Sequence, residues 1–129
     1  MLGACACAPE QHLVGADRDA HGCIGSAGYT WSEAQGSCVR LWEEGIRLDP
    51  ADAARETGAA YVVLSKDGTQ AELFVPVKTR PPLLTRAFTP DGPYWTDSQH
   101  TWLLKRLPSG WECWQGERLL YTAPNPQDD

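Results

Sequence analysis

The sequence has few cationic residues and no cluster of them. Eleven Lys and Arg stand against seventeen Asp and Glu, so the formal net charge is −6. Proteins that bind nucleic acids depend on Lys and Arg contacts to phosphates, and the composition therefore argues against a nucleic-acid partner. The acidic excess is concentrated in residues 1–58 and favours a basic partner through long-range attraction.

Long apolar runs are also absent. No stretch of the sequence reaches the roughly 18 apolar residues that a membrane-spanning helix needs. The N-terminal string Leu2-Gly3-Ala4-Cys5 resembles the lipobox of bacterial lipoprotein signals, in which the cysteine is lipidated. That resemblance implies a lipid on Cys5, a signal segment upstream of this chain, and a location in the periplasm or on the outer membrane. The polar residues that follow, up to about residue 20, predict a tether, so the lipid is the expected membrane contact.

The five cysteines lack the spacing of a zinc site. Zinc ligands usually come as C-x2-C pairs, whereas Cys23 and Cys38 lie fifteen positions apart and Cys113 stands alone. No cysteine, serine or histidine lies in a recognised catalytic signature, and Glu43 and Glu44 would point to opposite faces of a strand. We therefore expect no catalytic residue, no metal and no cofactor.

A disulfide is the remaining explanation for Cys23 and Cys38. The strings "YTW" and "CVRLW" are strand-like, and "SEAQGS" between them places Gly36 at a turn. Folding back at this turn brings Cys23 toward Cys38. A disulfide between them would close a loop of this length and stabilise the folded state by about 3 kcal/mol. Such a bond indicates an oxidising compartment. A pair between Cys7 and Cys113 and a free, buried Cys113 both remain open.

The rest of the chain is rich in glycine and proline, which favours short strands over long helices. Residues 49–58 contain Asp49, Pro50 and Gly58 in the order of a short helix with its start and stop signals. From Ala59 the apolar period is two, and Asp67-Gly68 marks a hairpin turn. Residues 89–100 predict a long loop that carries Tyr94 and Trp95. The expected fold is mainly β: a monomeric antiparallel meander barrel or sandwich of six or seven strands. Its expected parts are a tether (1–20), a cysteine hairpin (21–48), a helix (49–58), a meander (59–123) and a tail (124–129).

The hairpin segment resembles a motif of small secreted bacterial lipoproteins, D-x-x-G-C-x-x-S-A-G-Y-x-W-x6-C-x-R-x-x-E. The layout of the remainder is similar to compact β-barrel lipoproteins that include the membrane-bound inhibitors of c-type lysozyme. Those inhibitors insert a loop of the form S-G-x-x-Y into the active-site cleft of lysozyme. The nearest string here runs from Ser26 to Tyr29 and has a different spacing. The resemblance implies a small exported β protein that binds rather than catalyses.

We therefore expect a non-enzymatic, extracytoplasmic binding protein, with inhibition of a basic hydrolase such as lysozyme as the specific candidate. A structural envelope lipoprotein and a carbohydrate-binding module are the alternatives. Exposed aromatic residues and acidic side chains are the usual elements of such a contact. The predicted contact residues are Tyr94, Trp95, Glu43 and Glu44, with Glu33 and Asp49 adding charge, and the predicted structural residues are Gly28, Tyr29, Trp31 and Trp42.

Overall fold

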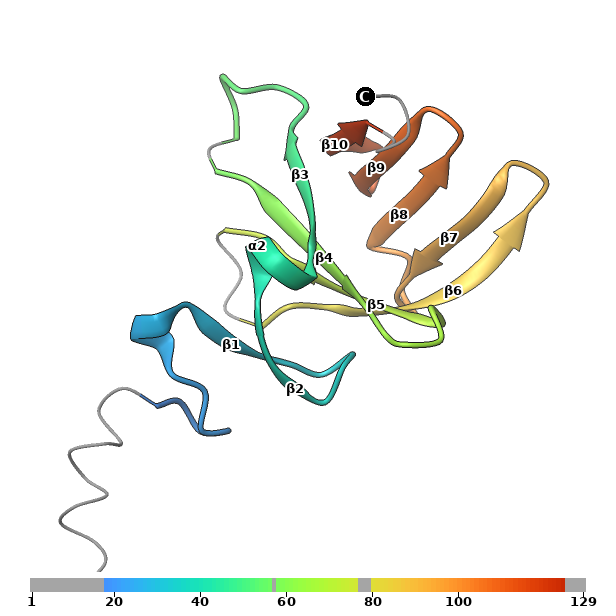
Figure 1. The fold of residues 1–129 in the computed structure, drawn as a ribbon. Helices are drawn as coiled ribbons and strands as arrows, with labels where there is room; N and C mark the ends of the chain where they lie inside the picture. Colours follow the sequence, from blue (N-terminus) through green and yellow to red (C-terminus); the bar gives the residue numbers. More distant parts are fainter. Residues whose placement is uncertain (1–17, 57, 77–79, 125–129) are drawn as a thin grey trace, which may run out of the picture.

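Short segments that alternate in polarity, separated by glycine- and proline-containing turns, form strands throughout the computed structural model (Figure 1). The structure describes residues 18–56, 58–76 and 80–124. Two strands pair as a hairpin, and eight others close into a barrel. The strands are β1 (Tyr29–Ser32), β2 (Ser37–Arg40), β3 (Ile46–Pro50), β4 (Ala60–Leu64), β5 (Gln70–Phe74), β6 (Leu83–Thr89), β7 (Gly92–Thr96), β8 (Trp102–Leu107), β9 (Gly110–Gln115) and β10 (Arg118–Pro124).

The barrel is an antiparallel meander in which strands consecutive in sequence are neighbours, from β3 to β10. It closes where the last strand meets the first, with Thr122 opposite Asp49 and Tyr121 opposite Pro50. The β1–β2 hairpin forms its own sheet outside the barrel, and Figure 1 shows it beside the β4 and β5 side. The predicted antiparallel meander barrel with a cysteine hairpin is confirmed, although the barrel has eight strands where six or seven were expected.

Side chains fill the barrel interior, as is usual when eight strands close on themselves. Trp95, Trp102 and Trp111 point inward, and the rings of Trp95 and Trp111 stack with centroids 5.5 Å apart. Cys113 also faces the core as a free thiol, and burial raises its pKa to about 12, so the thiol is protonated at neutral pH. The core residues are Leu48, Ala60, Val62, Ala71, Leu73, Val75, Leu84, Trp95, Trp102, Leu104, Trp111, Cys113, Leu120, Tyr121 and Ala123.

The predicted helix over residues 49–58 is wrong. Asp49 and Pro50 end strand β3, and bends and turns follow from residue 51 to residue 55. Pairing with β10 closes the barrel, and this tertiary gain outweighs a weak local helix signal. The short helix is instead α2 (Leu41–Glu44), a single turn between β2 and β3, preceded at a distance by the 3-10 turn η2 (Gly25–Ala27).

The predicted loop over residues 89–100 is also wrong, because its middle part forms strand β7. Pro93 lies near the start of that strand, before the pairing with β8 begins at Tyr94, so its missing N–H removes no hydrogen bond from that pairing. Residues 1–17 lie outside the described residues, and so do the predictions about Cys5, Cys7 and the tether.

Candidate functional site

The segment around Cys23 is held by a disulfide and by a carboxylate. Cys23 and Cys38 are bonded, with their Cα atoms 5.6 Å apart, which confirms the predicted pairing. Asp19 accepts hydrogen bonds from the backbone N–H of His21 at 2.8 Å and of Cys23 at 3.0 Å. The N–H groups of Cys23 and then His21 hold the pKa of Asp19 below its ordinary value. The disulfide and the hydrogen bonds to Asp19 together fix the segment that precedes β1.

The hairpin is anchored to the barrel through Glu72, on the outer face of β5. Only 2% of Glu72 is exposed. Its Oε1 accepts hydrogen bonds from the Ser32 hydroxyl at 2.8 Å and from the Ala34 N–H at 3.2 Å. Gln35 adds a third bond by donating its side-chain N–H to the Leu64 carbonyl at 3.1 Å. A buried charged group is costly unless it is hydrogen-bonded, so these contacts specify where the hairpin turn sits.

A cleft of about 620 Å³ opens between the hairpin and the segment that leads into β6. The rings of His21 and Trp31 form one side, stacked at 4.3 Å with an interplanar angle of 6°. The indole N–H of Trp31 donates to Glu33 Oε2 at 2.9 Å. The lining residues are His21, Trp31, Glu33, Glu72, Arg80, Pro81, Pro82 and Leu83.

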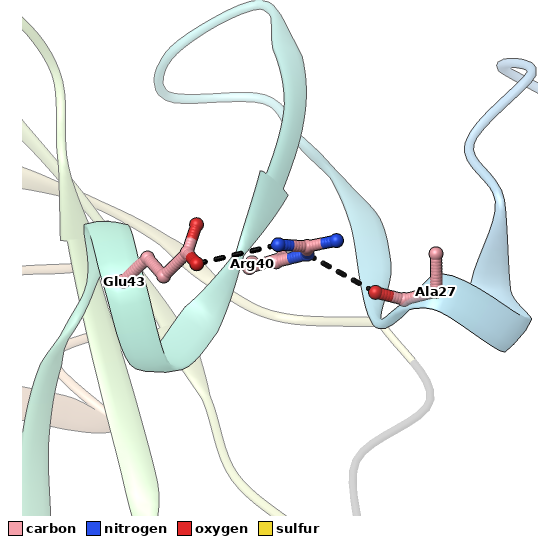
Figure 2. A network of polar contacts seen from close by, with 3 residues as sticks. All are labelled: Ala27, Arg40 and Glu43. Atoms are coloured by element: carbon pink, nitrogen blue, oxygen red, sulfur yellow. Dashed lines mark hydrogen bonds and ion pairs between the residues drawn. The ribbon is translucent and has the colours of Figure 1, made fainter.

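A second surface feature is the one-turn helix α2, which bears the predicted contact residues Glu43 and Glu44. Figure 2 shows Arg40 between the Glu43 carboxylate, at 3.3 Å, and the Ala27 carbonyl, to which its Nε donates at 3.1 Å. The charge of Glu43 is therefore partly balanced. Glu44 is exposed and makes no ion pair with any described residue.

The aromatic residues of the hairpin were predicted to be structural, and the structure divides them. Tyr29 carries the Arg40 guanidinium over its ring at 4.5 Å, and Trp31 stacks on His21, so both are half-buried within the hairpin. Trp42 differs, because 61% of it is exposed. Its ring edge lies against Gly28 and the side chain is not part of the barrel core, so the structural role predicted for Trp42 rests on the contact with Gly28.

The contact between Gly28 and Trp42 gives a testable expectation. Gly28 has φ +90°, and a Cβ at this position would collide with the Trp42 ring. Gly28→Ala is therefore expected to destabilise the hairpin by about 1–3 kcal/mol, from backbone strain and displacement of the indole. Urea unfolding measures the effect, with Gly25→Ala as the control because a Cβ there meets nothing within 4 Å. Equal stability of the two variants would contradict the packing of Trp42 on Gly28.

The predicted contact residues Tyr94 and Trp95 lie on opposite faces of β7. Trp95 is 2% exposed and donates its indole N–H to the Gly68 carbonyl at 2.9 Å. It therefore belongs to the core and is not available as a surface anchor, contrary to the prediction. Tyr94 faces outward and lines a shallow groove of about 200 Å³ together with Leu103 and Lys105. Strand pairing separates the two residues, since alternate side chains of a strand point to opposite faces.

Sequence reasoning missed Glu72 and His21 as site residues. The period of two in β5 does place Glu72 on the face opposite Ala71 and Leu73, which predicts an exposed side chain. Its burial depends on the hairpin turn around Ser32, forty positions earlier in the chain. No local pattern in the sequence signals a contact over that separation.

No protein family, curated protein or solved structure matches this chain in the comparisons made. Among the described residues, no helix is long and apolar enough to cross a membrane. The same residues contain no group of three or more His, Cys, Asp or Glu side chains placed to hold a metal ion. Two candidate binding sites remain, and their chemistry alone indicates what they could bind. They are the cleft and the surface of α2 formed by Trp42, Glu43 and Glu44, called the α2 surface below.

Proposed function

We propose that this protein is a non-enzymatic, extracytoplasmic binding protein, anchored through a lipid on Cys5, that docks a basic protein on α2. The observation that carries the proposal is the exposure of Trp42 between Arg40 and the two glutamates that follow it. Tryptophan is among the residues that contribute most to protein interfaces. A large apolar ring that is 61% exposed gains free energy when a partner covers it.

The charges around Trp42 favour a cationic partner. Glu44 is exposed without an ion-pair partner among the described residues, while Glu43 shares its charge with Arg40. An acidic rim around an aromatic anchor speeds the approach of a basic partner and orients it. A c-type lysozyme, a strongly basic hydrolase, is the first candidate, and inhibition of that enzyme is the specific activity proposed.

We expect Trp42→Ala to weaken binding to a c-type lysozyme by tenfold or more, mainly through faster dissociation. Glu44→Lys is expected to slow association at low salt and to have less effect when the charges are screened. Surface plasmon resonance at two salt concentrations measures both rates. A turbidity assay of bacterial cell lysis, run beside it, reports inhibition.

The barrel offers a matched control for each of the two substitutions in α2. Phe88 is 70% exposed and lies near the end of β6, and Figure 1 shows that this end of the strand is away from α2. Phe88→Ala therefore removes a comparable exposed ring. Glu117 is exposed in the turn between β9 and β10, so Glu117→Lys makes the same charge change elsewhere. Absence of binding by folded, disulfide-bonded protein at low salt would overturn the lysozyme proposal and favour a structural envelope role.

A further inference from the structure

The cleft between the hairpin and the barrel has a carboxylate in its lining, Glu72, with one oxygen that none of the described residues bonds. Glu72 is 98% buried, and the hydrogen bonds that it accepts from Ser32 and Ala34 both reach the same atom, Oε1. No described residue donates a hydrogen bond to Oε2. Because no buried side-chain oxygen among these residues lacks a partner, Oε2 is not sealed from solvent, and Glu72 lines the cleft. A carboxylate in this position attracts a donor that carries positive charge, because charge-assisted hydrogen bonds are about twice as strong as neutral ones.

The other residues that line the cleft favour a guanidinium group as the positively charged donor. The rings of His21 and Trp31 are stacked on each other, which leaves one face of each ring uncovered by the other, and planar guanidinium groups stack well on aromatic ring faces. Glu33 is held at the edge of this surface by the indole N–H of Trp31. Pro81, Pro82 and Leu83 lie on the other side and can cover methylene groups.

The size of the cleft favours a residue within a peptide over a small free cation. A volume of about 620 Å³ lies within the range that holds a drug-sized ligand. An arginine side chain would occupy only part of that space and would leave room for the backbone on either side. The aromatic surface and the carboxylates at Glu33 and Glu72 favour arginine over lysine, whose compact ammonium cannot form a bidentate pair.

Within the part of the chain that the structure describes, Arg80 is the one Lys or Arg side chain that lines the cleft, and it opposes a bound cation. It is exposed and forms no ion pair with a described residue, so solvent screens its charge. Arg80 therefore lowers affinity for a cationic ligand without preventing its binding. Removing this charge should tighten the binding.

We propose that this cleft binds an arginine side chain presented by a peptide segment of a partner protein. The guanidinium stacks on an uncovered ring face of the His21–Trp31 pair and donates hydrogen bonds to Glu72 Oε2 and to the Glu33 carboxylate. The site is separate from the α2 surface and needs only a short peptide, so its test does not depend on lysozyme binding.

The test uses the indole N–H signal of Trp31 in proton–nitrogen NMR spectra, identified by its loss in Trp31→Phe. The probes are acetyl-Gly-Arg-Gly-amide and the same peptide with neutral citrulline, in 0.15 M salt to screen nonspecific attraction. The arginine peptide is expected to shift this signal until it saturates, with a dissociation constant of about 1 mM. Such weak binding is expected when one side chain makes most of the contacts. Equal shifts with the citrulline peptide, or no shift with either, would overturn the proposal.

Three substitutions locate the site. Glu72→Gln keeps an oxygen acceptor for Ser32 and Ala34 but removes the charge, and is expected to weaken arginine-peptide binding about tenfold. Because Glu72 also anchors the hairpin, Glu33→Gln is a second variant that leaves this anchor intact, with an expected weakening of about threefold. Arg80→Gln should tighten binding about twofold.

The matched control is Glu117→Gln, which removes a carboxylate in the β9–β10 turn and should leave binding unchanged. Thermal melting confirms that each variant is folded. If folded Glu33→Gln and Glu72→Gln both bind the arginine peptide like the wild type, the cleft is not the site and the proposal fails. The lysozyme experiment would be unaffected, since Trp42 and Glu44 do not line the cleft.

Discussion

Trp95→Ala is expected to lower the free energy of unfolding by about 3–5 kcal/mol, the range for truncating a buried aromatic residue. The indole stacks on Trp111 inside the barrel and donates a hydrogen bond to the Gly68 carbonyl in the β4–β5 turn. Its removal leaves a cavity at the centre of the core and deprives that carbonyl of its donor. Urea unfolding followed by circular dichroism measures the change.

The matched control for Trp95→Ala is Trp42→Ala. Trp42 is 61% exposed and its ring edge lies against Gly28, so its truncation should cost well under half as much. Comparable losses for the two variants would show that Trp95 does not pack in the core as described. The comparison also separates the two roles, because Trp42→Ala is expected to affect binding and Trp95→Ala stability.

Cys38→Ser is expected to destabilise the hairpin by about 2–5 kcal/mol, the usual effect of removing a disulfide from a small domain. The bond to Cys23 closes a loop with a sequence separation of 15. A two-stranded hairpin is marginally stable by itself, and the contacts through Glu72 and Gln35 are few. The hairpin should therefore open while the barrel stays folded.

Amide hydrogen exchange resolves this local effect. In Cys38→Ser, the amides of β1 and β2 should lose protection, whereas those of β8 and β9 should keep most of theirs. Reduction of the wild type should reproduce the pattern, and Cys113→Ala, which removes the free thiol, should not. Unchanged protection of β1 and β2 in oxidised Cys38→Ser would contradict the stabilising role of the disulfide.

Local sequence signals succeeded where a short segment decides its own conformation. Asp67-Gly68 predicts a turn, and Gly68 has φ +78° there, while Asp67 accepts hydrogen bonds from the N–H and hydroxyl of Thr69. These bonds, with one from Ser65, lower the pKa of Asp67 to about 2. The hairpin at Gly36 was equally local, because its turn and its paired strands lie within a few residues of one another.

The alternation of residues in β9 shows which side chains share a face, but not which of the two faces is the inner one. Trp111 and Cys113 share the inner face of β9, and Trp114 lies on the outer face. A period of two suffices to group the residues by face, since a strand offers only two faces. Whether an outer residue is covered by another part of the chain is a separate matter.

The sequence by itself therefore determined the β class, the Asp67-Gly68 and Gly36 turns, and the Cys23–Cys38 pairing. Tertiary structure alone decided that Asp49 and Pro50 extend β3, because closing the barrel against β10 outweighs a weak helix signal. It also decided that Glu72 is buried beneath the hairpin and Trp42 exposed on α2. These outcomes depend on contacts between segments distant in sequence, and their free energies exceed the small local preferences that a sequence pattern records.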